Sequence, residues 1–150
     1  MFSHKPNPGA LNILPGTRPS GTFEWTRNGS SFQADHTLLG WGRTGWTLEA
    51  STGDRNSASF QAFFLLIPAD SESTIIKGKI STPDFLFQYF WNVSDQYGDV
   101  WSRSTYLEGH LDVDINVKEH TFKGEFAFQT PNPEQTGVDF RGDGTFNLRP

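Results

Sequence analysis

The sequence predicts a single all-β domain, built as an antiparallel β-sandwich or flattened barrel of about 8–10 short strands with almost no helix. Three observations support this fold class: apolar residues alternate with polar ones, turn residues interrupt the alternation at short intervals, and no window combines a helical period with helix caps. The chain has 150 residues, which is the size of one ordinary domain. A closed lipocalin-like β-barrel is the alternative architecture.

The apolar alternation starts near Gly21 and continues almost to the end of the chain. In the clearest run, Leu111, Val113 and Ile115 alternate with polar residues. Because successive side chains of a strand point to opposite faces, such a run gives one apolar and one polar face, as an antiparallel sheet allows. Runs of this kind occupy residues 23–25, 32–34, 46–50, 60–66, 85–93, 111–117 and 122–128.

The first 20 residues differ from the rest, with four prolines, two glycines and no alternation. Residues of these types interrupt helices and strands. We therefore expect an extended N-terminal arm over residues 1–20 and a single all-β domain over residues 21–150. The opening residues also lack the apolar stretch of an export signal. The sequence is thus that of a cytoplasmic protein, or of a secreted or periplasmic one from which a signal peptide has been removed.

Two runs are apolar on both faces. Phe63 and Leu65 alternate with Phe64 and Leu66, and residues 85–93 follow a similar pattern. Such strands cannot expose one whole face to water. Three explanations remain open: they are central strands with a covered outer face, strands at the interface of a homo-oligomer, or staves of a barrel around an apolar cavity.

Aromatic residues set the character of the core, and the charges limit the partners. With 14 Phe, 5 Trp and 3 Tyr, a Phe-rich core is predicted. The net charge is −5 and the basic residues form no cluster, so nucleic acids and anionic membranes are not expected as partners. Cysteine is absent, which rules out disulfides and thiolate sites. Because no apolar run approaches the roughly 20 residues of a membrane helix, no membrane span is expected.

A Gly-x-apolar motif recurs along the chain. Glycine within a strand marks a bulge, a bend, or a place where a large neighbouring ring lies over the backbone. The abundance of Phe favours the last of these explanations. The motif begins at Gly21, Gly78, Gly109, Gly124 and Gly144.

Two resemblances rest on these glycine motifs. Residues 109–148 contain GEFAF at 124–128, a loop, and GTF at 144–146. This segment resembles the closing strands of secreted bacterial all-β domains of unknown function, which implies an all-β fold and an extracytoplasmic, non-catalytic role. The opening Gly-Thr-Phe and the late Arg149 are also similar to calycins such as lipocalins, in which an early Gly-x-Trp packs under an Arg. Here Phe23 stands where those proteins have Trp.

A glycine-rich stretch, GWGRTGW at 40–46, carries the first candidate site. It places Trp41 and Trp46 on a turn, with Arg43 between them. A flat ring covers the C–H face of a planar or sugar ligand, while a guanidinium holds a hydroxyl or a carboxylate. The alternative is that one Trp closes the end of the core.

A second loop, over residues 95–103, repeats this chemistry with Tyr97, Trp101 and Arg103. If both loops lie at the same end of the fold, they form one aromatic rim for a ligand. If they lie at opposite ends, the rim hypothesis fails.

The strand pattern also predicts a register near the end of the chain. A turn at residues 119–120 pairs Val117 with Phe122 and places Asp114 directly opposite Glu125. Like charges opposed across two strands destabilise a sheet, so something should offset them.

Nearby lysines and water are one explanation for the opposed carboxylates, and a bound hard cation such as calcium is the other. The candidate ligands are Asp112, Asp114 and Glu125. No other cofactor is expected. The four histidines are scattered and show neither a zinc-binding spacing nor a Ser-His-Asp grouping.

The sequence thus favours a non-catalytic binding or interaction module whose contact surface is the aromatic loops, with a carbohydrate or another small molecule as the ligand. The alternative is a barrel that encloses a small apolar molecule, as a carrier or as an isomerase or cyclase. A closed cavity lined by Phe would support the barrel, whereas a solid core with Trp41 and Trp101 exposed would support the binding module.

Overall fold

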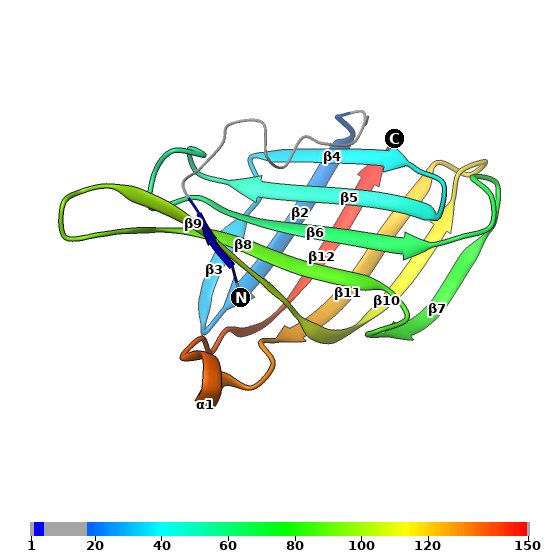
Figure 1. The fold of residues 1–150 in the computed structure, drawn as a ribbon. Helices are drawn as coiled ribbons and strands as arrows, with labels where there is room; N and C mark the ends of the chain where they lie inside the picture. Colours follow the sequence, from blue (N-terminus) through cyan, green and yellow to red (C-terminus); the bar gives the residue numbers. More distant parts are fainter. Residues whose placement is uncertain (1, 5–17, 150) are drawn as a thin grey trace.

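The computed structural model, which describes residues 2–4 and 18–149, consists of two antiparallel β-sheets packed face to face (Figure 1). The sandwich with almost no helix is therefore confirmed: the helix in the described residues is a single turn, α1 (Pro133–Thr136). The strands number twelve, which is more than expected, because several predicted runs are joined by short additional strands. No helix within the described residues is long and apolar enough to span a membrane.

We call the first sheet sheet A; its strands lie in the order β1-β9-β8-β6-β5-β4. The second, sheet B, has the order β3-β2-β12-β11-β10-β7. The strands of sheet A are β1 (Phe2–His4), β4 (His36–Trp41), β5 (Gly45–Thr52), β6 (Gln61–Pro68), β8 (Leu86–Ser94) and β9 (Val100–Tyr106). Those of sheet B are β2 (Ser20–Arg27), β3 (Ser30–Gln33), β7 (Ile76–Ser81), β10 (Glu108–Asn116), β11 (Thr121–Gln129) and β12 (Arg141–Arg149).

The chain turns two corners between the sheets. Strand β9 continues into β10 through the buried Leu107, whose backbone N–H donates to the carbonyl of Phe87 at 2.9 Å. Strand β3 passes into β4 in the same way, through Ala34 and Asp35. The strands of the two sheets cross at a steep angle (Figure 1), as in sandwiches whose strands change sheet at corners. The sheets do not close, so the lipocalin-like barrel is wrong.

Aromatic side chains fill the space between the sheets, as the composition predicted. Phe63 of β6 is fully buried at the centre. Its ring contacts rings from both sheets, namely Phe23, Trp25, Phe87, Tyr89, Phe126 and Phe128. Ring pairs at such distances add attraction beyond the area that they bury. The core is therefore packed with side chains between the two sheets.

Two of the recurrent glycines lie directly beneath aromatic rings, as expected for the Gly-x-apolar motif. A methyl group at Gly124 would lie 2.7 Å from Cζ of Phe146, and one at Gly144 would overlap the ring of Phe126. These strands therefore pass close under the core rings because they carry no Cβ there. The calycin arrangement is absent: Phe23 stacks on Phe146, and Arg149 is exposed opposite Ser20.

The register predicted for the last hairpin is wrong by two residues. Phe122 pairs with Ile115, not with Val117. The two strands are joined by a four-residue turn, 117–120, in which His120 adopts a left-handed conformation with φ 53°. The prediction had centred the turn on residues 119–120. Because the shift is an even number of residues, the apolar face stays on the core side.

This shift changes the charges that face each other. Asp114 lies opposite Lys123 on one neighbouring strand and opposite Lys77 on the other. The predicted opposition of Asp114 and Glu125 is therefore wrong. It is Asp112 that lies directly opposite Glu125.

The expected N-terminal arm contains a paired strand. Phe2–His4 form β1, which pairs antiparallel with β9 at one edge of sheet A. The domain proper begins one residue earlier than expected, where β2 starts at Ser20. Residues 5–17 of the arm lie outside the described residues.

The strands with two apolar faces are inner strands of sheet A. β6 lies between β5 and β8, and β8 lies between β6 and β9. Their outward-pointing Phe64, Leu66, Leu86 and Phe90 are half-buried. Of the three explanations, the stave of a barrel is excluded, and the covered face and the oligomer interface remain.

Candidate functional site

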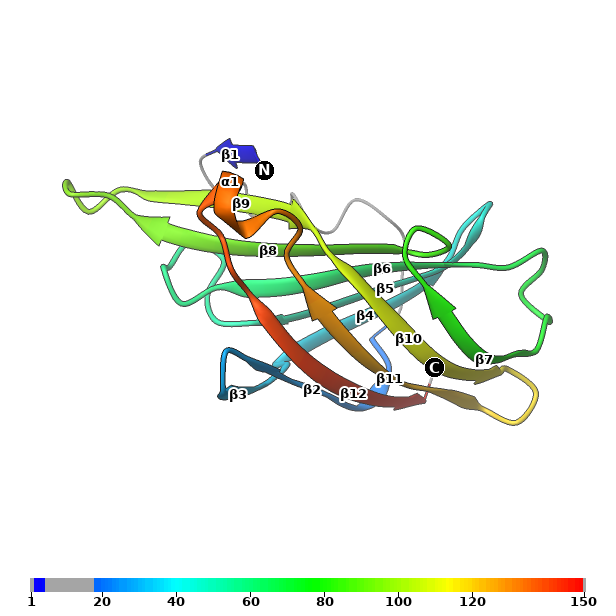
Figure 2. The ribbon, with the colours of Figure 1, turned by 90° about the horizontal axis from the view of Figure 1, so that it is seen from below.

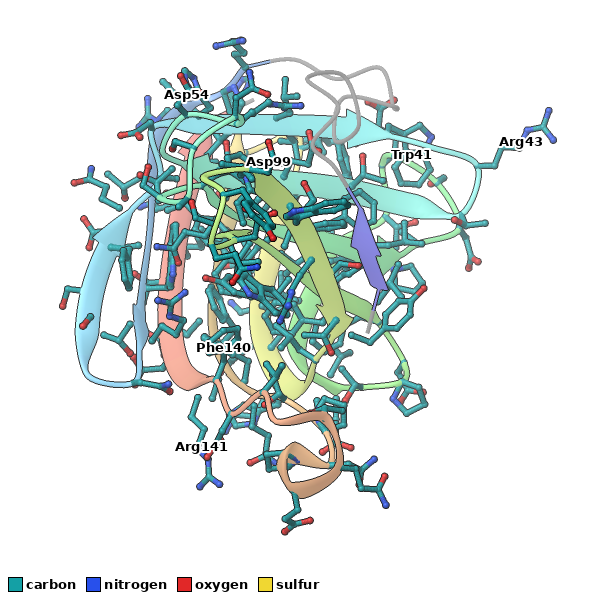
Figure 3. All side chains as sticks on the ribbon, turned by 60° about the vertical axis from the view of Figure 1, so that its left-hand side comes forward. Trp41, Arg43, Asp54, Asp99, Phe140 and Arg141 are labelled. Carbon is teal, nitrogen blue, oxygen red and sulfur yellow. The ribbon has the colours of Figure 1, made fainter. Side chains whose placement is uncertain are left out.

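The first aromatic loop is the tight turn between β4 and β5. Trp41 and Trp46 pair across this turn, with ring centroids 5.2 Å apart and planes at 67°. Trp46 is only 4% exposed and packs edge-on against Phe122 of sheet B. Trp41 is half-buried, and Arg43 extends away from the fold (Figure 3). Trp46 therefore closes one end of the core, and Trp41 and Arg43 remain accessible.

The second loop is the hairpin between β8 and β9. Its tip is held by Asp95, whose Oδ1 accepts hydrogen bonds from the backbone N–H groups of Tyr97 and Asp99 at 2.9 and 3.0 Å. The indole Nε1 of Trp101 donates to Asp95 Oδ2 at 3.0 Å. Tyr97 is 82% exposed. This hairpin thus presents a free phenol ring, whereas its tryptophan is half-buried and tied to the loop.

These two loops lie at opposite ends of sheet A. The β4–β5 turn is at the end where β8 begins, whereas the β8–β9 hairpin is at the end where β4 begins, because each successive pair of strands is antiparallel. Figure 1 shows the hairpin projecting on the left and the β4–β5 turn on the right. The single aromatic rim therefore does not exist.

Beside the second loop, a polar cluster closes the space between the sheets. Tyr89 donates its hydroxyl to Gln61 Oε1, and Arg27 Nη1 donates to Tyr89 Oη at 3.1 Å. The Arg27 guanidinium also lies 4.8 Å from the ring centroid of Phe140. Burial raises the pKa of Tyr89 to about 12, and Arg27 opposes this shift. Arg103 of β9 lies near this end, and its buried Nε has no hydrogen-bond partner.

The largest of the hollows described for this fold is a groove of about 860 Å³ on the outer face of sheet B. Its axis follows a row of directly paired residues that crosses all six strands (Figure 2). Every member of this row is polar and exposed. We call it the polar row; from β3 to β7 it consists of Gln33, Glu24, Thr145, Glu125, Asp112 and Lys79.

A second line of polar residues runs beside the polar row. Thr26 and Asp143 lie in it and bond to each other: Thr26 Oγ1 donates to Asp143 Oδ1 at 3.0 Å, and the Asp143 N–H donates to Thr26 Oγ1 at 3.2 Å. His110 lies further along on β10. At the β3 end the half-buried Phe32 adds an aromatic wall. The groove therefore offers hydrogen-bond acceptors, donors and one apolar surface.

Sequence reasoning missed this groove, because its residues come from six strands and each strand alone shows an ordinary polar face. The signal that does exist is the polar half of each alternation, such as His110, Asp112 and Asp114 on β10. Only the register shows which of these residues become neighbours.

The three carboxylates expected to hold calcium are not gathered around one point. Asp112 and Glu125 face each other in the polar row, while Asp114 lies in the next row between Lys77 and Lys123. Within residues 2–4 and 18–149, no group of three or more His, Cys, Asp or Glu side chains is arranged to hold a metal ion.

Comparison of the chain with protein families, curated proteins and solved structures gave no match. Any functional assignment therefore has to come from the geometry and chemistry of the sites themselves.

Proposed function

We propose that this chain is a non-catalytic binding module that holds a carbohydrate chain in the groove of sheet B. The observation that carries the proposal is the polar row, an unbroken line of six exposed polar side chains across the sheet. With strands about 4.8 Å apart, the row extends over about 24 Å. This length suits an extended chain of several sugar rings better than a single small molecule.

The chemistry of the groove fits a ligand rich in hydroxyl groups. Each sugar hydroxyl both donates and accepts hydrogen bonds. The carboxylates of Glu24, Glu125 and Asp112 accept them, and Lys79 donates them. Hydrogen bonds to charged groups are stronger than those between neutral partners. Phe32 offers a ring face for the C–H surface of a sugar at one end of the groove.

Binding is favoured over glycoside cleavage by the exposure of the facing carboxylates. Asp112 and Glu125 lie directly opposite each other, as two catalytic acids would. Both are exposed to water, whereas a catalytic carboxylic acid is kept protonated by less polar surroundings. Nothing in the groove distinguishes one of these residues as the acid and the other as the nucleophile.

The proposal is tested by titrating the protein with soluble hexasaccharides of glucose, xylose, galactose and N-acetylglucosamine, followed by calorimetry. We expect at least one to bind, and the double variant Glu24→Gln, Glu125→Gln to weaken that binding by about tenfold or more, because two charge-assisted hydrogen bonds are lost. The matched control is Glu119→Gln, in the exposed β10–β11 turn, which should leave the affinity unchanged.

Three results would contradict the proposal. One is the absence of binding to every sugar. Another is binding that the Glu24 and Glu125 changes leave intact but that Trp41→Ala or Tyr97→Ala abolishes, since this would return the site to the aromatic loops. The third is tight binding of polylysine with no affinity for sugars, which would make the groove a site for basic peptides.

A further inference from the structure

A second, smaller hollow lies on the opposite side of the sandwich, on the outer face of sheet A. It has a volume of about 330 Å³ and lies over β4, β5 and β6 beside the loop that joins β5 to β6. This is within the usual size range of small-molecule sites. We call it the Glu49 pocket. Its floor includes Leu38 and Ala62, and its polar lining includes Glu49, His36, Asp54 and Arg55.

Glu49 is the unusual residue in this pocket. In the register it stands between Leu38 of β4 and Phe64 of β6, so its cross-strand neighbours are apolar. Its Oε1 is buried and has no hydrogen-bond partner. A buried polar atom without a partner costs roughly 1–3 kcal/mol, and native proteins leave few such atoms. An acceptor of this kind, exposed to a pocket, is available to a donor on a ligand.

Burial also changes the protonation of this carboxyl group. It raises the pKa of Glu49 to about 7, and the positive charge of Arg55 acts against this increase. The other charged groups around the pocket are His36 on β4, Asp54 in the loop, and Arg18. β6 contributes Ala62 and no charged side chain to the lining.

The loop that forms one wall of the pocket is held in place before any ligand binds. Asn92 of β8, which is 6% exposed, donates through Nδ2 to the carbonyls of Arg55 at 2.8 Å and Ser57 at 2.9 Å. At the other end of the loop, Asp35 Oδ2 accepts from Thr52 Oγ1 at 2.8 Å and from the Gly53 N–H at 3.1 Å. A wall fixed in this way lowers the entropic cost of binding.

The charges in the pocket are arranged at two levels. The carboxyl group of Glu49 lies inside, against apolar neighbours, whereas Arg18 lies at the exposed rim, with Nη1 3.3 Å from His36 Nδ1. An ammonium group suits the inner position, because it has three donors and a charge opposite to that of the ionised carboxylate. An anionic group suits the rim, where an Arg fork can hold it.

We propose that the Glu49 pocket binds a small zwitterion of the α-amino acid type, with its ammonium group on Glu49 and its carboxylate toward Arg18 and Arg55. This site is separate from the groove of sheet B. Figure 3 shows Asp54 of the pocket wall at the same end of the fold as Asp99 of the β8–β9 hairpin, and away from Arg43. The pocket is thus also distinct from the β4–β5 turn.

The test is calorimetric titration with the free α-amino acids, and with two matched sets that lack one charge: the amino acid amides and the corresponding deaminated acids. We expect at least one free amino acid to bind and its two single-charge analogues to bind about tenfold or more weakly. The variant Glu49→Gln should lose most of the binding. The control Glu72→Gln, on an exposed loop of sheet A, should bind as the unaltered protein does.

A second readout separates a direct contact from a structural effect. If the ammonium group binds ionised Glu49, binding at pH 6 should release close to one proton, and Glu49→Gln should abolish this release. Proton release is obtained from the binding heats in buffers of different ionisation enthalpy.

The proposal is overturned if no amino acid binds, if the amides bind as well as the free acids, or if Glu49→Gln, with an unchanged melting temperature, binds normally. The groove variant Glu24→Gln, Glu125→Gln should retain amino acid binding, so that the two sites fail or succeed independently.

Discussion

The two outer faces of this sandwich are built on one shared aromatic core but differ in chemistry. The outer face of sheet B carries exposed polar side chains over all six strands. The outer face of sheet A carries half-buried apolar residues such as Phe64, Leu66 and Phe90, and one partly buried acid, Glu49. Binding by hydrogen bonds to water-exposed groups is suited to the first face, and binding of a small charged group against an apolar background to the second.

The largest effect should come from the core that both faces share. Replacing Phe63 with Ala removes a fully buried ring that contacts both sheets, and we expect a loss of about 3–5 kcal/mol in the free energy of unfolding. Urea denaturation followed by tryptophan fluorescence measures this loss. A loss below about 1 kcal/mol would show that the two sheets are not held together at this ring.

The neighbouring residue tests the outer face of sheet A. Phe64 points outward from the same strand and is half-buried. Phe64→Ala should therefore cost only about 1–2 kcal/mol, in proportion to the area that remains covered. A cost equal to that of Phe63→Ala would mean that this outer face is covered as completely as the core. The comparison uses the same denaturation experiment.

The pH dependence of stability should reveal Glu49. Its pKa is raised to about 7 by burial, so between the ordinary pKa of a glutamate and pH 7 the folded state holds a proton that the unfolded state has lost. Stability should therefore be greater at acidic pH within this window and fall as the pH rises to 7. Because water screens this partly exposed group, we expect a change of only about 1 kcal/mol.

The matched variant for this pH effect is Glu49→Gln, which keeps the shape but cannot ionise. Thermal melts at several pH values between 5 and 8 should show a flatter profile for this variant. An unchanged slope would assign the pH dependence to other groups.

The smallest effect concerns the polar row. Glu125 faces Asp112 directly, so Glu125→Gln should stabilise the fold by a few tenths of a kcal/mol. Asp114 faces Lys77 and Lys123, so Asp114→Asn should destabilise it by a similar amount. Both effects should decrease in high salt. Equal signs for the two changes would contradict the observed register.

The sequence was sufficient to predict the strands and their faces, because the alternation of β10 and β11 fixes which side chains point to the core. It was not sufficient for the register, which depended on the left-handed conformation of His120 in a four-residue turn. A shift of two residues preserves the faces and leaves the alternation unchanged. Charge pairs such as Asp112 and Glu125 therefore could not be assigned in advance.

The sites depended on contacts between strands that are distant in sequence. Trp41 and Trp101 were correctly identified as parts of two aromatic loops, but their position at opposite ends follows from the order of the strands in sheet A. Glu49 looks like an ordinary outward-facing residue between Leu48 and Ala50. Its burial arises from β4, β6 and the loop that Asn92 holds in place.

The central claim is that a carbohydrate chain lies along the polar row of sheet B. The most direct measurement is an NMR titration of the ¹⁵N-labelled protein with the hexasaccharide that binds best. We predict that the amide shifts with the largest changes belong to the polar row and its neighbours on β2, β12, β11 and β10. Shifts confined to Trp41, Tyr97 and Trp101, or no specific shifts with any of the sugars, would contradict the claim.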